Sequence, residues 1–303
     1  MSEFADVLRK SHAAVKLKFT WFGIKKSLDG DQKRQAREVF NAKDGFLSAS
    51  KKLLDTKHPA VKAVNGLRGE IRLYFRHATL PFPEDGVRLV KREKLTELLD
   101  TITMFVGKLD QAVAALNDAW DELKQQAKEE LGELYDENDY PNSLDGKFSV
   151  TCHVVNTNPP DYLKETLPGV YRLEQERIGR QMEAAVALAE QSFTAEFAKM
   201  VGSLGEQLSG ALDGKVKRFS KGHLENIKGF FERFKELDLG SNERLGQLVE
   251  QAQAACDGVE IGRLKESKSL QRTVAESMSE IGKQLEGMVE LRPARAVSFD
   301  DEE

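Results

Sequence analysis

Cysteine is scarce in this chain: Cys152 and Cys256 are the two among 303 residues. Two cysteines cannot form a disulfide framework or a four-cysteine zinc site, and we expect a reducing, cytoplasmic compartment. The sequence has no run of about 18 apolar residues, so no membrane span is predicted. The first residues lack a basic start followed by an apolar stretch, which argues against a secretory signal.

The motifs of common catalytic sites are also missing. The five histidines include no pair at the spacing of helical metal ligands, and neither a phosphate-binding Gly-rich loop with its lysine nor a Gly-x-Ser-x-Gly elbow occurs. Cys152 falls on the apolar phase of its segment, which favours a buried structural thiol over a nucleophile. We therefore expect a protein that is not an enzyme and needs no cofactor or metal.

Proline is rare, with eight residues, whereas good helix formers are abundant. The charged fraction of 31%, the apolar fraction of 40% and the net charge of −5 are typical of a folded soluble protein. The composition predicts a mainly α protein. We expect an elongated bundle with a long antiparallel, coiled-coil-like helical hairpin and a small two- or three-stranded β element.

Two segments alternate apolar and polar residues as strands do. In residues 15–22 valine, leucine, phenylalanine and tryptophan alternate with lysine and threonine, and residues 147–155 repeat the pattern. An isolated strand leaves its backbone groups unpaired, so these two are expected to pair with each other. A short segment at Val87–Val90 could add a third strand.

The strongest pattern is a heptad seam within a predicted helix over 93–134. Its apolar residues recur at alternating spacings of four and three, which indicates a coiled-coil-like face. This seam needs an apolar partner, supplied either by the chain's own helices or by another molecule. The seam residues are Leu95, Leu99, Ile102, Val106, Leu109, Val113, Leu116, Trp120, Leu123 and Ala127.

A second long helix is predicted from about 170 to 212, with a repeat closer to eleven residues than to seven. We expect it to form the hairpin with the first long helix. Shorter helices are predicted over 31–55, with an interruption at 43–45 as the alternative, from Pro59 to about His77, and over 215–239, 241–257 and 264–289. The expected domains are 1–92 with the first strand and helices, 93–214 with the hairpin and an inserted strand at 147–155, 215–291 with the C-terminal helices, and 292–303 as a disordered acidic tail.

Two basic features could contact nucleic acid. Residues 215–235 hold seven lysines and arginines against two glutamates, and the interleaved phenylalanines could stack on bases. A core face of phenylalanines backed by solvated lysines is the favoured alternative. An arginine stripe at i, i+4 spacing could bind phosphate, although ion pairs with acidic neighbours are favoured. The candidate contacts are Arg68, Arg72 and Arg76 of the stripe, with Lys215, Lys217, Arg218, Lys221 and Lys228.

Several short motifs resemble a family of bacterial and phage proteins of unknown function. They are Trp21-x-Gly23-x-Lys25, residues 51–54 (Lys-Lys-Leu-Leu), residues 79–82 with Asp85-Gly86, Phe230-x-x-Arg233-Phe234, residues 251–253 with Gly258-Val259, and Arg292-Pro293. Such proteins are often encoded beside MoxR-type AAA+ ATPases, so the resemblance implies an accessory or assembly role. We expect an interaction protein that self-associates or binds a protein partner such as an AAA+ ATPase. The alternative is a nucleic-acid-binding protein.

Overall fold

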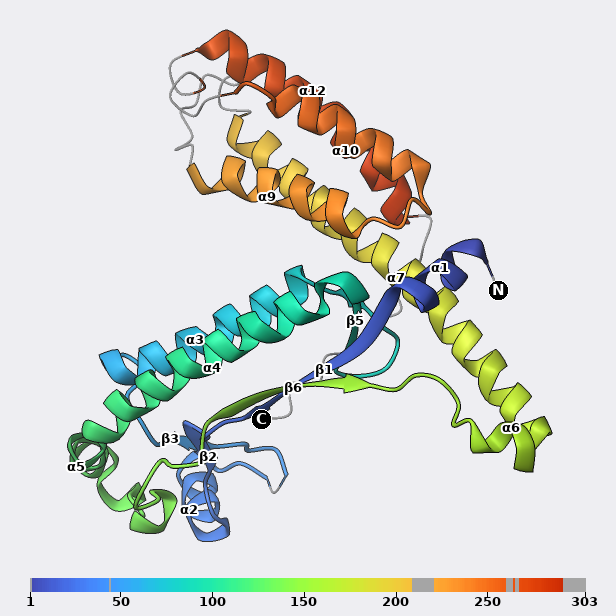
Figure 1. The fold of residues 1–303 in the computed structure, drawn as a ribbon. Helices are drawn as coiled ribbons and strands as arrows, with labels where there is room; N and C mark the ends of the chain where they lie inside the picture. Colours follow the sequence, from blue (N-terminus) through green and yellow to red (C-terminus); the bar gives the residue numbers. More distant parts are fainter. Residues whose placement is uncertain (1, 44, 209–220, 260–263, 265–266, 291–303) are drawn as a thin grey trace. The chain divides into compact units, whose positions relative to one another are not determined.

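The computed structural model describes residues 2–43, 45–208, 221–259, 264 and 267–290 (Figure 1). The described chain is mainly helical with a small β element, as the composition predicts. It forms two compact units, each described by itself below. Among the described residues, unit 1 comprises 2–15, 77–92 and the part after 153, and unit 2 comprises 16–76 and 93–153.

Unit 1 is built around one long helix, α7. This helix contacts α12, α1 and α9, and α10 packs against α12. The described helices of unit 1 are α1 (Glu3–Ser11), α6 (Tyr162–Thr166), α7 (Pro168–Leu208), α9 (Lys221–Leu237), α10 (Glu243–Cys256) and α12 (Lys268–Glu290). The predicted helices after residue 170 are thus confirmed within about six residues at each described end.

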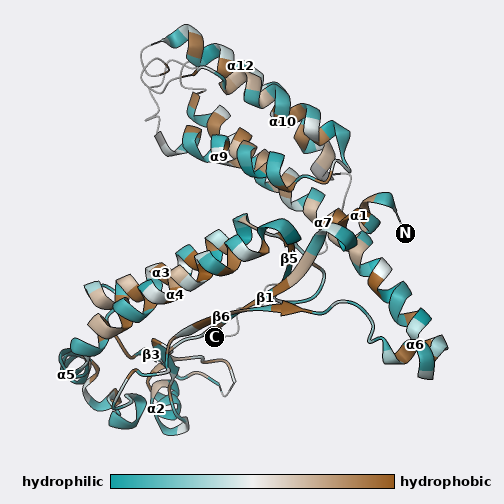
Figure 2. Cartoon of the chain, in the orientation of Figure 1, coloured by the Kyte–Doolittle hydropathy of each residue, from teal (hydrophilic) through white to brown (hydrophobic). Residues whose placement is uncertain are grey.

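Aromatic rings form the centre of the unit 1 core. Phe197 of α7 is fully buried and stacks on Phe230 of α9 with ring centroids 5.2 Å apart. Phe193 meets Phe234 edge to face at 5.2 Å. Such pairs stabilise a core beyond the area that they bury. Figure 2 shows hydrophobic and hydrophilic residues alternating along these helices, as expected for helices with one buried face.

Unit 2 packs α3 and α4 together over the inner face of a strand. Its core joins Val64 and Ile71 of α3 to Ile102 and Leu109 of α4, with Phe19 partly buried against them. The helices and short strands of unit 2 are β2 (Lys25–Ser27), α2 (Gly30–Phe40), β3 (Ser50–Lys52), α3 (Pro59–His77, whose last residue belongs to unit 1), α4 (Leu95–Asp118), α5 (Trp120–Leu131) and the 3₁₀ turns Gly132–Leu134 and Glu137–Asp139. A further 3₁₀ turn, Arg92–Lys94, precedes α4.

A four-stranded sheet has the order β4-β5-β1-β6, and β2 pairs with β3 in a separate ribbon. The strands of the sheet are β1 (His12–Thr20), β4 (Leu80–Pro81), β5 (Val87–Lys91) and β6 (Ser149–Val155). The two strands expected from alternation are confirmed, as is the third at Val87–Val90. Along β1, Leu17 and Phe19 are partly buried while Lys16 and Lys18 are exposed, as the alternation predicts.

The expected hairpin of two long helices is wrong. The apolar face of α4 is covered by α3 within unit 2, and that of α7 by α12 and α9 within unit 1. The helix expected over 93–134 is also interrupted at Ala119, where φ is −89° and ψ is 3°, between α4 and α5. An apolar stripe shows that a face is buried but does not specify its partner.

The helix expected over 31–55 ends much earlier. It stops at Phe40, since Asn41 adopts the left-handed conformation with φ 49° and its backbone N–H caps the last carbonyls. Gly45 follows with φ 80°, a conformation that costs glycine little. The chain then enters strand β3, so Leu53 and Leu54 reach the core after a strand and not on a helix.

The two units also cut across the expected domains 1–92, 93–214 and 215–291. The chain passes between units at residues 15/16, 76/77, 92/93 and 153/154, so each unit is assembled from separate stretches. Two of these points lie inside β1 and β6. The expected tail, 292–303, lies outside the described residues.

Candidate functional site

The heptad seam lies in the core of unit 2. Ile102, Leu109, Leu116, Trp120 and Leu123 are each at most 4% exposed. The remaining seam positions are mostly half-buried; they are Leu95, Leu99, Val106 and Val113, with Ala127 at 8% exposure. The partner of the seam is therefore α3 of the same chain, together with the aromatic residues after β1. This surface is used within the molecule.

The arginine stripe of α3 lies over aromatic rings. The guanidinium of Arg68 is 5.4 Å from the centre of the Trp21 ring, and that of Arg72 is 5.2 Å from the centre of the Phe19 ring. A cation over an aromatic face is attracted by the ring's quadrupole. Arg72 and Arg76 are exposed, whereas Arg68 is half-buried. Arg68 and Arg72 are thus each held by a contact between the guanidinium group and an aromatic ring.

The basic segment 215–235 is described in part. Lys215, Lys217 and Arg218 lie outside the described residues, as does the side chain of Lys221. Lys228 is exposed, and its Nζ donates to the carbonyl oxygen of Val259 at 3.5 Å. The phenylalanines at 230, 231 and 234 are buried at 0–6% exposure. These three rings are core residues, so they are not available to stack on bases.

The motifs quoted above fall on core positions and turns. Arg233 pairs with Glu196 of α7 at 2.5 Å, while Phe230 and Phe234 fill the unit 1 core. Gly258 has a φ of 68°, in the region that favours glycine, and Gly86 has one of 73°. Two other motifs meet in the β2–β3 ribbon: Lys25 lies opposite Lys52 and Lys26 lies opposite Lys51.

A buried ion cluster that the sequence did not reveal lies beneath this ribbon. The Asp139 carboxylate is fully buried, pairs with Lys26, and lies 2.7 Å from the Nζ of Lys51. Lys51 also donates to the carbonyl oxygen of Leu134 at 2.6 Å. Burial alone would raise the pKa of Asp139, but hydrogen bonds from the two lysines hold it below its usual value. The same contact with Asp139 raises the pKa of Lys26.

Aromatic groups surround this cluster and anchor it. The hydroxyl of Tyr140 donates to the carbonyl oxygen of Leu53 at 2.9 Å, and burial raises its pKa to about 12. The indole of Trp120 donates to the carbonyl oxygen of Pro141 at 2.8 Å. Sequence reasoning missed Asp139 because its lysine partners are 113 and 88 residues away in the chain. The acidic turn around it carries no signal of burial.

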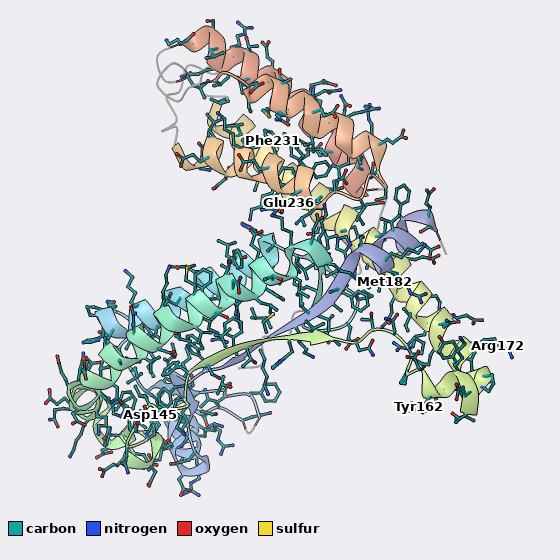
Figure 3. The ribbon with its side chains drawn as sticks, viewed as in Figure 1. Asp145, Tyr162, Arg172, Met182, Phe231 and Glu236 are labelled. Carbon is teal, nitrogen blue, oxygen red and sulfur yellow. The ribbon has the colours of Figure 1, made fainter. Side chains whose placement is uncertain are left out.

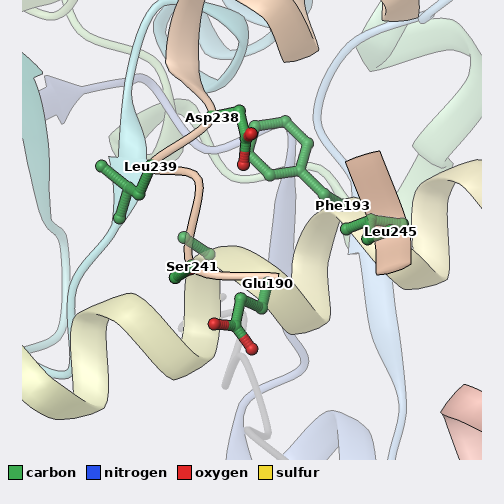
Figure 4. Close-up of a pocket in the computed structure, with 7 residues that line it drawn as sticks. Glu190, Phe193, Asp238, Leu239, Ser241 and Leu245 are labelled. Atoms are coloured by element: carbon green, nitrogen blue, oxygen red, sulfur yellow. The ribbon is translucent and has the colours of Figure 1, made fainter. Parts of the chain in front are cut away.

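A small cavity in unit 1 brings two carboxylates near each other (Figure 4). It is lined by Glu190 and Phe193 of α7, by Asp238 and Leu239 after α9, and by Leu245 among others. Burial first, and then the charge of Glu190, raises the pKa of Asp238, although backbone N–H groups of the next residues oppose the shift. The cavity holds about 10 Å³, which is room for one water molecule at most. It cannot admit a substrate.

The thiols and the buried histidine are poor candidates for chemistry. Burial raises the pKa of Cys152 and raises that of Cys256 to about 11, so both thiols are protonated at neutral pH. Burial, together with the nearby Lys91, lowers the pKa of His12 to about 4. Among the described residues, no group of three or more histidine, cysteine or acidic side chains is placed to hold a metal.

Exposed apolar side chains gather at the α6–α7 end of unit 1. Tyr162, Leu167, Val170 and Leu173 are 65%, 53%, 43% and 63% exposed. The first buried residue of α7 is Ile178, so the preceding turns of this helix contribute nothing to the core. Figure 3 labels Tyr162 of α6 and Arg172 of α7 at this end of the helix. We call these four residues the elbow patch.

Comparison of the chain with protein-family models, with curated proteins and with solved structures found no match. No helix in the described parts of the chain is long and apolar enough to cross a membrane.

Proposed function

We propose that this chain is a non-catalytic interaction or assembly protein of bacterial or phage origin that acts through an exposed helical surface. The observation that carries the proposal is the elbow patch. Large apolar side chains that cluster outside a core, with charged residues around them, are typical of a protein-binding surface. Exposed charged residues beside the patch include Lys164, Glu165 and Arg172.

This surface differs from the one that the sequence predicts. The heptad seam is buried inside unit 2, whereas the four residues of the elbow patch are each at least 43% exposed. The partner is a second copy of the chain or another protein. The resemblance to proteins encoded beside MoxR-type AAA+ ATPases favours an ATPase of that class as the partner.

The test is a paired substitution in the elbow patch, Leu167→Glu with Leu173→Glu. Burying a carboxylate in an apolar contact is costly, so we expect the affinity of self-association or of partner binding to fall at least about tenfold. The measurements are molar mass by light scattering over a concentration series and co-purification from the native host.

The matched control is Leu73→Glu with Met104→Glu, on exposed apolar residues of unit 2 at 49% and 52% exposure. It should assemble as the unaltered protein does. A monomer at every concentration that brings down no partner would contradict the proposal. So would equal assembly by the elbow variant and the unaltered chain.

A second candidate function, nucleic-acid binding, is favoured by the division of charge within unit 2. Residues 16–76 hold 15 lysines and arginines against 6 acidic residues, a net charge of +9, whereas residues 93–153 hold 5 against 14, a net charge of −9. Lysines and arginines in such a basic stretch can bind phosphate backbones and release counterions. Arg68, Arg72 and Arg76 belong to the basic stretch, with the basic segment 215–235 as the other candidate contact.

A further inference from the structure

The outer face of the β2–β3 ribbon carries two lysines directly opposite each other. In the antiparallel register Lys25 faces Lys52, and two positions along Ser27 faces Ser50. Residues two apart in a strand share a face, so all four side chains lie on one side of the ribbon. All four residues are exposed. Like charges directly opposite each other destabilise a strand pair, so this face favours an anion as its partner.

The inner face of the same ribbon shows how such a pair is accommodated. Lys26 and Lys51 also lie opposite each other, and the buried carboxylate of Asp139 binds both. No carboxylate of the described residues forms an ion pair with Lys25 or Lys52. One lysine pair thus shares an internal anion, and the other is presented to solvent together with two hydroxyl groups.

The connection between the two strands adds exposed aromatic rings. After β2 the backbone N–H of Leu28 donates to the carbonyl oxygen of Ala49 at 3.0 Å. This hydrogen bond joins the two ends of the segment that connects β2 to β3 and contains α2. Within this connection Phe40 is 74% exposed and Phe46 is 87% exposed. None of the residues of α2 is buried. Water-exposed phenylalanines in the segment that joins two basic strands suit a ligand that offers both negative charge and flat rings.

We infer that the outer face of the β2–β3 ribbon, Lys25, Ser27, Ser50 and Lys52, binds the phosphate backbone of single-stranded nucleic acid, with Phe40 and Phe46 stacking on its bases. Lysine ammonium and serine hydroxyl groups are common phosphate contacts. Base stacking on aromatic side chains is typical of single-strand binding and tolerates any sequence. The ligand class is that of the second candidate function, but the residues are different.

An anionic membrane fits these residues less well. A helix that lies in a membrane interface needs an apolar stripe along its length. The apolar residues of α2 are instead confined to its last turns, at Ala36, Val39 and Phe40, after a start rich in charge. The pair of serines opposite each other also supplies hydrogen bonds suited to phosphate and no apolar contact.

The experiment measures fluorescence anisotropy of a labelled oligothymidylate and of a duplex of equal length, with the full chain, across a salt series. For Lys25→Glu with Lys52→Glu we expect single-strand affinity to fall at least about tenfold. The slope of log affinity against log salt should shrink by about 0.7 for each lysine. Phe40→Ala with Phe46→Ala should weaken single-strand binding about tenfold while leaving duplex binding unchanged.

The matched control is Lys128→Glu with Lys147→Glu, which reverses two exposed lysines of the same unit and changes the net charge equally. Its affinity should stay within about twofold of the unaltered protein. Absence of binding at low salt, or equal losses in the two charge reversals, would overturn the inference. Binding to phosphatidylserine vesicles that depends on Lys25 and Lys52, without oligonucleotide binding, would also overturn it.

A third variant separates this inference from the second candidate function. If Arg68→Glu with Arg72→Glu and Arg76→Glu abolishes binding while the ribbon variant binds normally, nucleic-acid binding stands and the ribbon site is wrong. If the ribbon variant loses binding and the arginine variant keeps it, the ribbon site stands. Assembly through the elbow patch is measured by separate experiments. If that proposal fails, the nucleic-acid results can still be interpreted.

Discussion

At the scale of single residues, Asp139 shows how one buried charge can organise a turn. Its carboxylate holds two lysines from two different strands, and the next residue, Tyr140, reaches the backbone of Leu53. A buried charge is tolerated only where it is paired and hydrogen-bonded, because leaving water is costly. Removing the carboxylate would leave Lys51 charged and only 4% exposed without its counterion.

We therefore expect Asp139→Asn to lower the free energy of unfolding by about 3 kcal/mol, since breaking a buried ion pair leaves an uncompensated charge. The measurement is urea unfolding monitored by fluorescence. Asp145→Asn, at an exposed position of the same acidic region, should change little.

The effect of Asp139 should also depend on pH. Its pKa is lowered in the folded protein, so its stabilising contribution is complete above the unfolded pKa of about 3.9 and is lost as pH falls through the folded value. The difference between the unaltered protein and Asp139→Asn should shrink below that range. Equal stability of the two proteins at pH 7 would contradict the role assigned to the ion cluster.

At the scale of elements, α2 is stabilised by capping interactions at its two ends and not by packing against a core. Asp29 and Gln32 form a capping box at its start, and Asn41 ends it. None of its residues is buried. Short helices are marginal in water when no tertiary contact supports them, so α2 depends on its caps in the free protein.

Hydrogen exchange should distinguish α2 from α3. Amides of α2 are expected to exchange within the earliest time points, because the free energy of local opening is close to zero where no apolar contact holds a segment. Amides of α3 near the fully buried Ile71 should remain protected. The check is exchange followed by mass spectrometry on peptides from both helices. Equal protection of the two in the free protein would show that α2 is packed against something.

At the scale of the whole molecule, the chain divides into two units with separate apolar cores. One core is centred on Phe197 of α7 and the other on the seam residues of α4 and α5. Both tryptophans, Trp21 and Trp120, belong to unit 2. Tryptophan fluorescence therefore reports on unit 2, whereas the far-UV circular dichroism of helices reports on both units.

Phe197→Ala should separate the two signals. Truncating a fully buried phenylalanine costs about 3–5 kcal/mol, so the circular dichroism transition should begin at lower denaturant while the fluorescence midpoint stays in place. Leu109→Ala, in unit 2, should lower the fluorescence midpoint. Identical shifts of both signals in both variants would show that the units unfold as one cooperative body.

The candidate site was only partly predictable. The arginine spacing at 68, 72 and 76 placed these residues on one helix face, but the aromatic rings beneath them come from β1 and the residue that follows it. The alternation that predicted β1 is absent from β2 and β3, which are three residues each and hold only lysine and serine. The lysine pairs of the ribbon depend on the register of two strands separated by more than twenty residues.

By itself the sequence determined the helical class, the two alternating strands and the burial of the heptad face. These follow from local periodicity, which the backbone geometry of helices and strands converts directly into faces. Only the tertiary structure decided that α3 covers the seam, that Asp139 joins Lys26 to Lys51, and that the two long helices belong to different units. Apolar stripes are interchangeable as partners, and pairing between distant segments depends on shape and register that no local pattern encodes.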